Sequence, residues 1–282
     1  MIFLLKRTLT ALVGIAILIP VVIFSNTWFL NVSSSIMVSI AVYEILNCIG
    51  ALKKPMVSVP AFAVALVPQI LSRLLDAETC LSVMLMVYMG FFVALMTVAV
   101  FSHGSVKFGT ACISAVMVAY VSFGFLSLIL LRDSSESTGL VLFVLALIIP
   151  WVCDITAYFV GVLFGKHKMI PDVSPKKTVE GAIGGVAGVV IAAAIYGMIM
   201  QFGFGKMPNY PLLLVIALVG GLVSQWGDLI ASLLKREYGI KDYGKIFPGH
   251  GGVMDRFDSL FAVAIFIYIV FRIFAAHPLF LS

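Results

Sequence analysis

Nine long apolar segments constrain the fold of this sequence more than any other feature. They lie near residues 8–26, 32–50, 57–75, 81–101, 109–131, 139–165, 181–202, 211–234 and 257–276. Each is long enough to cross roughly 30 Å of hydrocarbon as a helix. The apolar runs are continuous rather than alternating, which favours helices over a β-barrel. We therefore predict an all-α, polytopic integral membrane protein with about nine transmembrane helices.

The composition supports a membrane protein. Of the 282 residues, 62% are hydrophobic and 11% are charged, whereas about a quarter of an ordinary soluble domain is charged. The net charge of +5 does not indicate nucleic-acid binding, because the basic residues lie in short loops between apolar segments. Cysteines stand far apart, mostly inside those segments, and we interpret them as apolar side chains rather than metal ligands or disulfide partners. They are Cys48, Cys80, Cys112 and Cys153.

The basic residues also predict the orientation of the segments. With nine spans and a cytoplasmic N-terminus, fourteen Lys and Arg residues fall on the inner face and four on the outer face. Positive charge concentrates on the cytoplasmic side of membrane proteins. The two most polar loops, 166–180 and 235–256, then share the cytoplasmic side, and the C-terminus lies outside. A signal peptide is the alternative for segment 8–26, but no small-residue cleavage site follows it, so we expect an uncleaved span.

Three carboxylates lie inside apolar segments, where an ionised group costs several kcal/mol unless it is paired or hydrated. Glu44 has Asn47 one turn further on, and this favours an inter-helix hydrogen bond over a role in a site. Asp154 either lines a polar cavity or bonds a neighbouring helix. Asp228 differs, because its helix face continues through Ser232 to a pair of bases, Lys235 and Arg236.

The loop after that face contains "FPGHGGVMDRFD", with three glycines around His250 just before a new apolar segment. Glycines let the backbone approach a ligand and turn N–H groups towards it, and a helix start favours anions. Asp255 alone would indicate a helix cap. In this sequence, however, Asp255 lies close to Asp258, several basic residues and these glycines. The combination indicates a site for phosphates and a divalent cation.

The other polar loop, "GKHKMIPDVSPKKTVEGAIGG", has a similar composition. We predict that Lys176 and Lys177 contact phosphate and that Thr178 begins the next helix. Lys166 and Lys168 are better explained as charges that set topology. Four glycines follow at helical spacing, and close helix packing explains them better than ligand binding does. They are Gly181, Gly184, Gly185 and Gly188.

Residues 232–258, "SLLKREYGIKDYGKIFPGHGGVMDRFD", closely resemble the signature of phosphatidate cytidylyltransferases, also called CDP-diacylglycerol synthases. Residues 150–260 as a whole are similar to that family, whereas the N-terminal helices match it only in hydropathy. All eleven fixed positions of the signature are met. They are Ser232, Lys235, Arg236, Lys241, Asp242, His250, Gly251, Gly252, Asp255, Arg256 and Asp258.

This resemblance implies that CTP and phosphatidate react to give CDP-diacylglycerol and pyrophosphate, with Mg²⁺ held by Asp228 and Asp255. It implies catalytic roles for those two residues and for Lys235 and His250. The substrate-binding residues that it implies are Ser174, Lys176, Lys177, Ser232, Arg236, Lys241, Gly251, Gly252, Arg256 and Asp258.

The same resemblance implies that residues 1–105 form N-terminal transmembrane helices and that residues 106–282 form the catalytic bundle. Its expected location is the cell's inner (cytoplasmic) membrane, with the active site facing the cytoplasm. The expected partners are CTP, phosphatidate and the lipid bilayer, and no nucleic acid is expected. A homodimer is possible. Two alternatives remain. One is a CTP-dependent lipid kinase of the polyprenol or dolichol type, and the other is an anion transporter, which the lack of a detectable inverted repeat disfavours.

Overall fold

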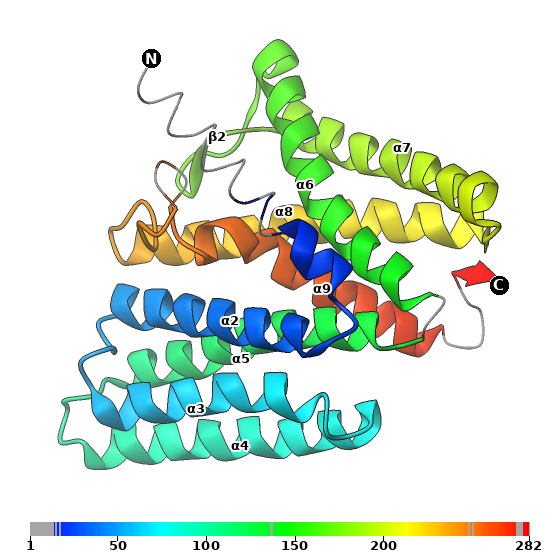
Figure 1. Ribbon diagram of the computed structural model, residues 1–282. Helices are drawn as coiled ribbons and strands as arrows, with labels where there is room; N and C mark the ends of the chain where they lie inside the picture. The colour runs from blue at the N-terminus through cyan, green and yellow to red at the C-terminus, as the bar shows by residue number, and fades with distance from the viewer. Residues whose placement is uncertain are drawn as a thin grey trace. The chain divides into compact units, whose positions relative to one another are not determined.

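The computed structural model describes residues 14, 16, 18–135, 138–247, 249, 251–274 and 279–281 of the chain. Of these, residues 18–23 are helical, and eight further helices, α2 to α9, follow the predicted segments within a few residues (Figure 1). They are α2 Trp28–Cys48, α3 Pro55–Leu71, α4 Ala77–Phe101, α5 Phe108–Arg132, α6 Gly139–Phe164, α7 Val179–Phe204, α8 Tyr210–Glu237 and α9 Met254–Ile273. The predicted segment 8–26 lies partly outside the described residues.

Six of these helices, α2 and α4 to α8, are long and apolar enough to cross a membrane. The helix α3 has 17 residues and falls short of that length. The first turns of α9 carry Asp255, Arg256 and Asp258. The all-α, polytopic class is therefore confirmed, whereas the count of nine spans is not.

The chain divides into two compact units, residues 1–130 with 237–257 and residues 131–236 with 258–282. In the first unit, α2 to α5 lie side by side (Figure 1). The helix α3 continues through two prolines and is tied to its neighbours by buried polar groups. The amide of Asn31 donates to the Gln69 carbonyl at 2.7 Å, and Gln69 in turn donates to the Ser122 carbonyl at 3.3 Å. These bonds connect α2, α3 and α5.

In the second unit, α6 and α7 pack closely through the predicted glycines. A Cβ at Gly181 would lie 2.8 Å from the Ala157 carbonyl oxygen, and one at Gly185 would lie 3.1 Å from that of Cys153. Even an alanine would therefore separate the two helices. The packing prediction for these glycines is confirmed.

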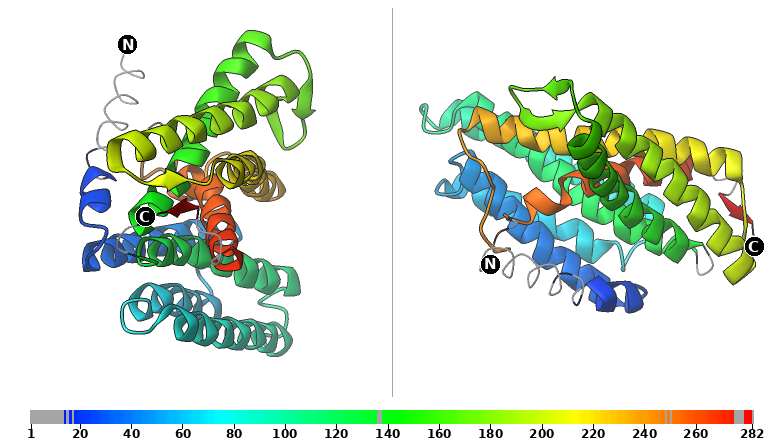
Figure 2. Two further views of the ribbon diagram at one scale, coloured as in Figure 1. Left: turned by 90° about the vertical axis from the view of Figure 1, so that its right-hand side faces the viewer. Right: turned by 90° about the horizontal axis from the view of Figure 1, so that it is seen from above.

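Two short antiparallel strand pairs, which hydropathy did not predict, also lie in the second unit (Figure 2). The strands β1 Lys168–Ile170 and β2 Ser174–Thr178 form a hairpin between α6 and α7, and β3 Met207–Pro208 pairs with β4 Phe280–Leu281. At the end of the hairpin, the Thr178 hydroxyl accepts a bond from the Gly181 amide at 3.1 Å. This side chain caps α7, as the sequence predicts.

Candidate functional site

The second unit brings three predicted site residues together where β2 meets α8. Lys177 Nζ lies 2.5 Å from Asp228 Oδ2, and the Ser232 hydroxyl lies 3.4 Å from Asp228 Oδ1. The side chains of Lys177 and Asp228 are 25% and 27% exposed, so a ligand can reach the pair. We call these three residues the lysine–aspartate cluster. The helix face that carries Asp228 and Ser232 was predicted, but its lysine partner from the hairpin was not.

Charged residues in the last turn of α8 support this cluster. Arg236 Nε donates to the Val173 carbonyl at 3.1 Å and so ties the helix to the hairpin. Lys235 is 9% exposed and Asp258 is 6% exposed. Asp258 interacts electrostatically with Lys235, Asp228 and Asp154. Of these groups, the carboxylates of Asp228 and Asp154 repel the carboxylate of Asp258, whereas the ammonium of Lys235 attracts it.

The hairpin has its own carboxylate anchor at the start of α7. Glu180 accepts bonds from the amides of Lys166 and His167 and lies 2.6 Å from His167 Nδ1. Lys166 therefore contributes a backbone contact here. Lys176 is exposed, and Ser174 is half-buried. These contacts hold the base of the hairpin, while Lys176 and Lys177 project from its second strand.

The first unit holds the glycine-rich part of the signature, residues 241–256. Asp255 Oδ2 accepts bonds from the Tyr243 amide at 2.7 Å and the Gly252 amide at 3.0 Å. Gly251 has a φ of +86°, and a Cβ there would lie 2.7 Å from Asp255 Oδ2. A glycine is therefore required at this position for two reasons. Two more predicted site residues, Lys241 and Arg256, are exposed, as is the signature residue Asp242, and the predicted catalytic His250 lies outside the described residues.

Glu44 joins this loop from α2. Its Oε1 accepts a bond from the Val253 amide at 3.1 Å, and its Oε2 accepts one from the Met254 amide at 2.8 Å. The hydrogen-bonding interpretation of Glu44 is confirmed, and its partner is the start of α9. The amides of residues 252–254 thus donate to two protein carboxylates, a use of this turn that the sequence did not predict.

The carboxylates of Asp228 and Asp255 are each of the ligand type that Mg²⁺ takes, since this ion binds one or two carboxylates and completes its shell with phosphates and water. Asp228 already holds a cation, the ammonium of Lys177, at one of its oxygens. Among the described residues, no three or more His, Cys, Asp or Glu side chains gather as a metal-binding group.

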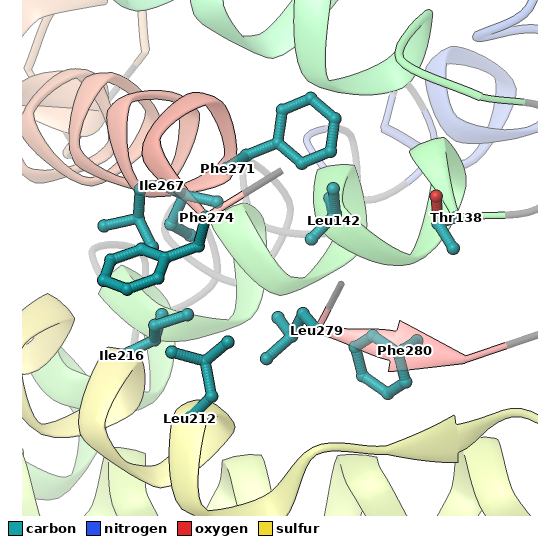
Figure 3. Close-up of a pocket in the computed structure, with 10 residues that line it drawn as sticks. Thr138, Leu142, Leu212, Ile216, Ile267, Phe271, Phe274, Leu279 and Phe280 are labelled. Atoms are coloured by element: carbon teal, nitrogen blue, oxygen red, sulfur yellow. The ribbon is translucent and has the colours of Figure 1, made fainter. Parts of the chain in front are cut away.

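A separate pocket in the second unit does not suit an anionic substrate. Its lining comes mainly from α6, α8, α9 and β4 with the preceding Leu279 (Figure 3). It contains Leu142, Leu212 and Phe271, and Thr138 is the polar lining residue. Leu212 precedes Asp228 by 16 residues on α8, which corresponds to about 24 Å along the helix. The pocket therefore lies towards the opposite end of α8 from the lysine–aspartate cluster.

Known proteins match almost the whole chain. The model of the Cytidylyltransferase family matches residues 5–274. The phosphatidate cytidylyltransferase of Staphylococcus haemolyticus is 34% identical over 263 residues, which are 91% of this chain and 95% of that protein. The phosphatidate cytidylyltransferase of Staphylococcus aureus is 33% identical over 260 residues, with the same coverage. This chain therefore belongs to the cytidylyltransferase family.

Proposed function

We propose that this multi-pass membrane protein is an enzyme that transfers the cytidylyl group of CTP to phosphatidate, giving CDP-diacylglycerol and pyrophosphate. The complete signature at residues 232–258 carries this proposal. The relatives support it, because proteins named phosphatidate cytidylyltransferase align over 91% of the chain. A lipid kinase that uses CTP is the alternative, and the names of these relatives do not favour it.

The chemistry requires two anions to meet. A phosphate oxygen of phosphatidate attacks the α-phosphorus of CTP, the bond from that phosphorus to the bridging oxygen breaks, and pyrophosphate leaves. Bases at the site offset the repulsion between the substrates and the charge of the leaving group. We assign this role to Lys177, Arg236 and Arg256. Mg²⁺ held by Asp228 and Asp255, an assignment that rests on the family resemblance, would stabilise the leaving pyrophosphate.

Isotope labelling tests this reaction directly. The purified protein is incubated with phosphatidate, Mg²⁺ and CTP labelled either at the α- or at the γ-phosphorus. Cytidylyl transfer moves α-label into lipid and γ-label into pyrophosphate. In a parallel reaction with a polyprenol in place of phosphatidate, a lipid kinase would instead move γ-label onto the polyprenol hydroxyl and leave α-label in CDP. If neither label enters the lipid, the proposed function is wrong.

The Lys177–Asp228 contact suggests how the hairpin serves the substrates. A lysine that lies 2.5 Å from a proposed metal ligand would also lie beside phosphates bound to that metal. Lys177→Gln should raise the KM for CTP or phosphatidate by about 10- to 150-fold, because one charge-assisted hydrogen bond contributes about 1.5–3 kcal/mol. Replacing both Lys176 and Lys177 should raise that KM further. Steady-state kinetics with each substrate varied in turn measure the change.

Lys168→Gln is the matched control for this prediction. It removes the same charge from the same hairpin at an exposed position to which we assign no substrate contact. Normal kinetics in the Lys177 variants would mean that the hairpin lysines only set membrane orientation.

The orientation that we propose places both polar loops in the cytoplasm, where CTP is made. In a background without the four native cysteines, single cysteines at Lys168 and Lys245 should be protected from an impermeant thiol reagent in intact cells. A cysteine at Asn209, between α7 and α8, should react. All three positions are exposed, whereas a side chain at the neighbouring Gly244 would overlap Glu44. Labelling of Lys168 and Lys245 positions from outside would overturn the proposed orientation.

A further inference from the structure

Glu44 belongs to the N-terminal helices, outside the signature, yet its side chain reaches into the signature loop. The residues that it contacts follow it by 209 and 210 positions. We propose that Glu44 is a positioning residue for the reaction, which fixes the backbone of Val253 and Met254 and thereby places Asp255. This inference rests on the proposed function, because it concerns the carboxylate to which we assign Mg²⁺.

The Glu44 carboxylate is buried, and its two oxygens accept hydrogen bonds from backbone amides. The residue is 1% exposed and lies in an apolar helix, where a carboxylate needs hydrogen bonds to offset its burial. Both of its oxygens accept bonds from successive backbone amides, at 3.1 and 2.8 Å. Bonds from N–H groups to an ionised acceptor are stronger than those to a neutral one. The pair of oxygens thus holds the first residues of α9 at two points.

Two glycines of the loop leave room for this carboxylate. A Cβ built at Gly244 or at Gly252 would overlap Oε1 of Glu44. The two glycines stand on opposite arms of the loop, and a Cβ at Gly244 would also lie 3.2 Å from the Cα of Gly252. The loop therefore encloses the Glu44 side chain from two sides. Gly252 is a fixed signature position, whereas Gly244 is not. The Glu44 carboxylate explains why both positions need a residue without a side chain.

The backbone links Glu44 to Asp255. Gly252, which directly precedes the amides bound to Glu44, donates its own amide to Asp255 Oδ2 at 3.0 Å. The same oxygen accepts the Tyr243 amide from the other arm of the loop. A shift of Val253 and Met254 would therefore move the partners that orient Asp255. Glu44 acts through these groups and needs no contact with the substrate.

The first test compares Glu44→Gln and Glu44→Ala with wild type in the α-label assay, with Mg²⁺ varied. Since small displacements at a reacting centre can cost about 100-fold in rate, we expect kcat to fall roughly that far in Glu44→Ala and less in Glu44→Gln. The Mg²⁺ concentration for half-maximal rate should rise in both variants. A loss of folded enzyme would lower the rate but leave that Mg²⁺ concentration unchanged. Glu78→Gln, an exposed glutamate in α4, is the control and should match wild type.

The second test does not depend on activity. Lys241 and Lys245 are exposed in the loop, so limited trypsin cleavage after them reports its mobility. Cleavage there should be faster in Glu44→Ala, while cleavage after Lys176 in the hairpin stays constant. Gly244→Ala should also lower kcat and speed trypsin cleavage of the loop. The double variant Glu44→Ala/Gly244→Ala should differ little from Glu44→Ala in either measurement, because both substitutions disrupt the same contact.

The outcomes separate this inference from the proposed function. If wild type transfers no α-label, the proposed function is wrong, and the trypsin result alone decides whether Glu44 holds the loop. If wild type is active and the Glu44 variants keep a normal Mg²⁺ dependence, Glu44 is not a positioning residue. Unchanged trypsin cleavage in Glu44→Ala would likewise overturn the inference.

Discussion

Replacing Asp228 with Asn should abolish cytidylyl transfer and leave a folded protein. The carboxylate is the proposed Mg²⁺ ligand from α8 and lies 2.5 Å from Lys177. An amide keeps the shape of the side chain but binds a divalent cation poorly. Losing a metal ligand removes several kcal/mol of transition-state stabilisation, which corresponds to about a thousandfold in rate. The measurement is the α-label assay at saturating Mg²⁺.

Asp172→Asn is the matched control, because this aspartate lies in the exposed turn of the β1–β2 hairpin and has no role in our proposal. It should keep wild-type activity. Folding is monitored by the elution profile of the detergent-solubilised protein, which should be unchanged in both variants. Activity above about a tenth of wild type in Asp228→Asn, a loss of less than about 1.4 kcal/mol, would remove Asp228 from the metal site.

Asp255→Asn should be as inactive as Asp228→Asn. We expect the cause to be loss of the metal ligand rather than a change in loop structure. The oxygen of an asparagine can still accept the amides of Tyr243 and Gly252, which Asp255 Oδ2 accepts in the structure. The loop should therefore keep its conformation while the proposed metal ligand is lost. We expect a rate loss of about a thousandfold together with normal trypsin cleavage after Lys241 and Lys245.

This pattern differs from the one expected for Glu44→Ala, in which the loop becomes more mobile and the rate falls about 100-fold. If Asp255→Asn instead increased trypsin cleavage as much as Glu44→Ala does, the carboxylate of Asp255 would be needed for loop structure. Its assignment as a metal ligand would then lose its support.

The sequence predicts the helices well because their ends coincide with changes in hydropathy. The segment predicted at 139–165 is the helix Gly139–Phe164 in the structure. The start of α7 could be predicted from its capping residue, Thr178. Prolines were less informative, since α3 remains helical through Pro60 and Pro68. The β1–β2 hairpin was missed because strands of three and five residues are too short to produce a recognisable period.

The candidate site was predictable only where its residues share one helix or one motif. Asp228 and Ser232 lie one turn apart, so their common face can be read from the sequence. Lys177 reaches Asp228 from the hairpin, and Glu44 reaches Val253 from a different helix. No spacing rule connects such residues, because the contacts depend on how helices pack. A single sequence therefore indicated that Glu44 needs a hydrogen-bonding partner without identifying it.

The distance in sequence between Glu44 and its partners also has a consequence for biosynthesis. A ribosome that adds about 5–20 residues per second needs roughly 10–40 s to extend the chain from Glu44 to Met254. Throughout that interval the nascent helix α2 carries a carboxylate without its final amide donors, and an ionised carboxylate inside a membrane segment is costly. Chains that end before Val253 never receive these donors. We expect membrane quality-control proteases to remove such truncated chains faster than the full-length protein.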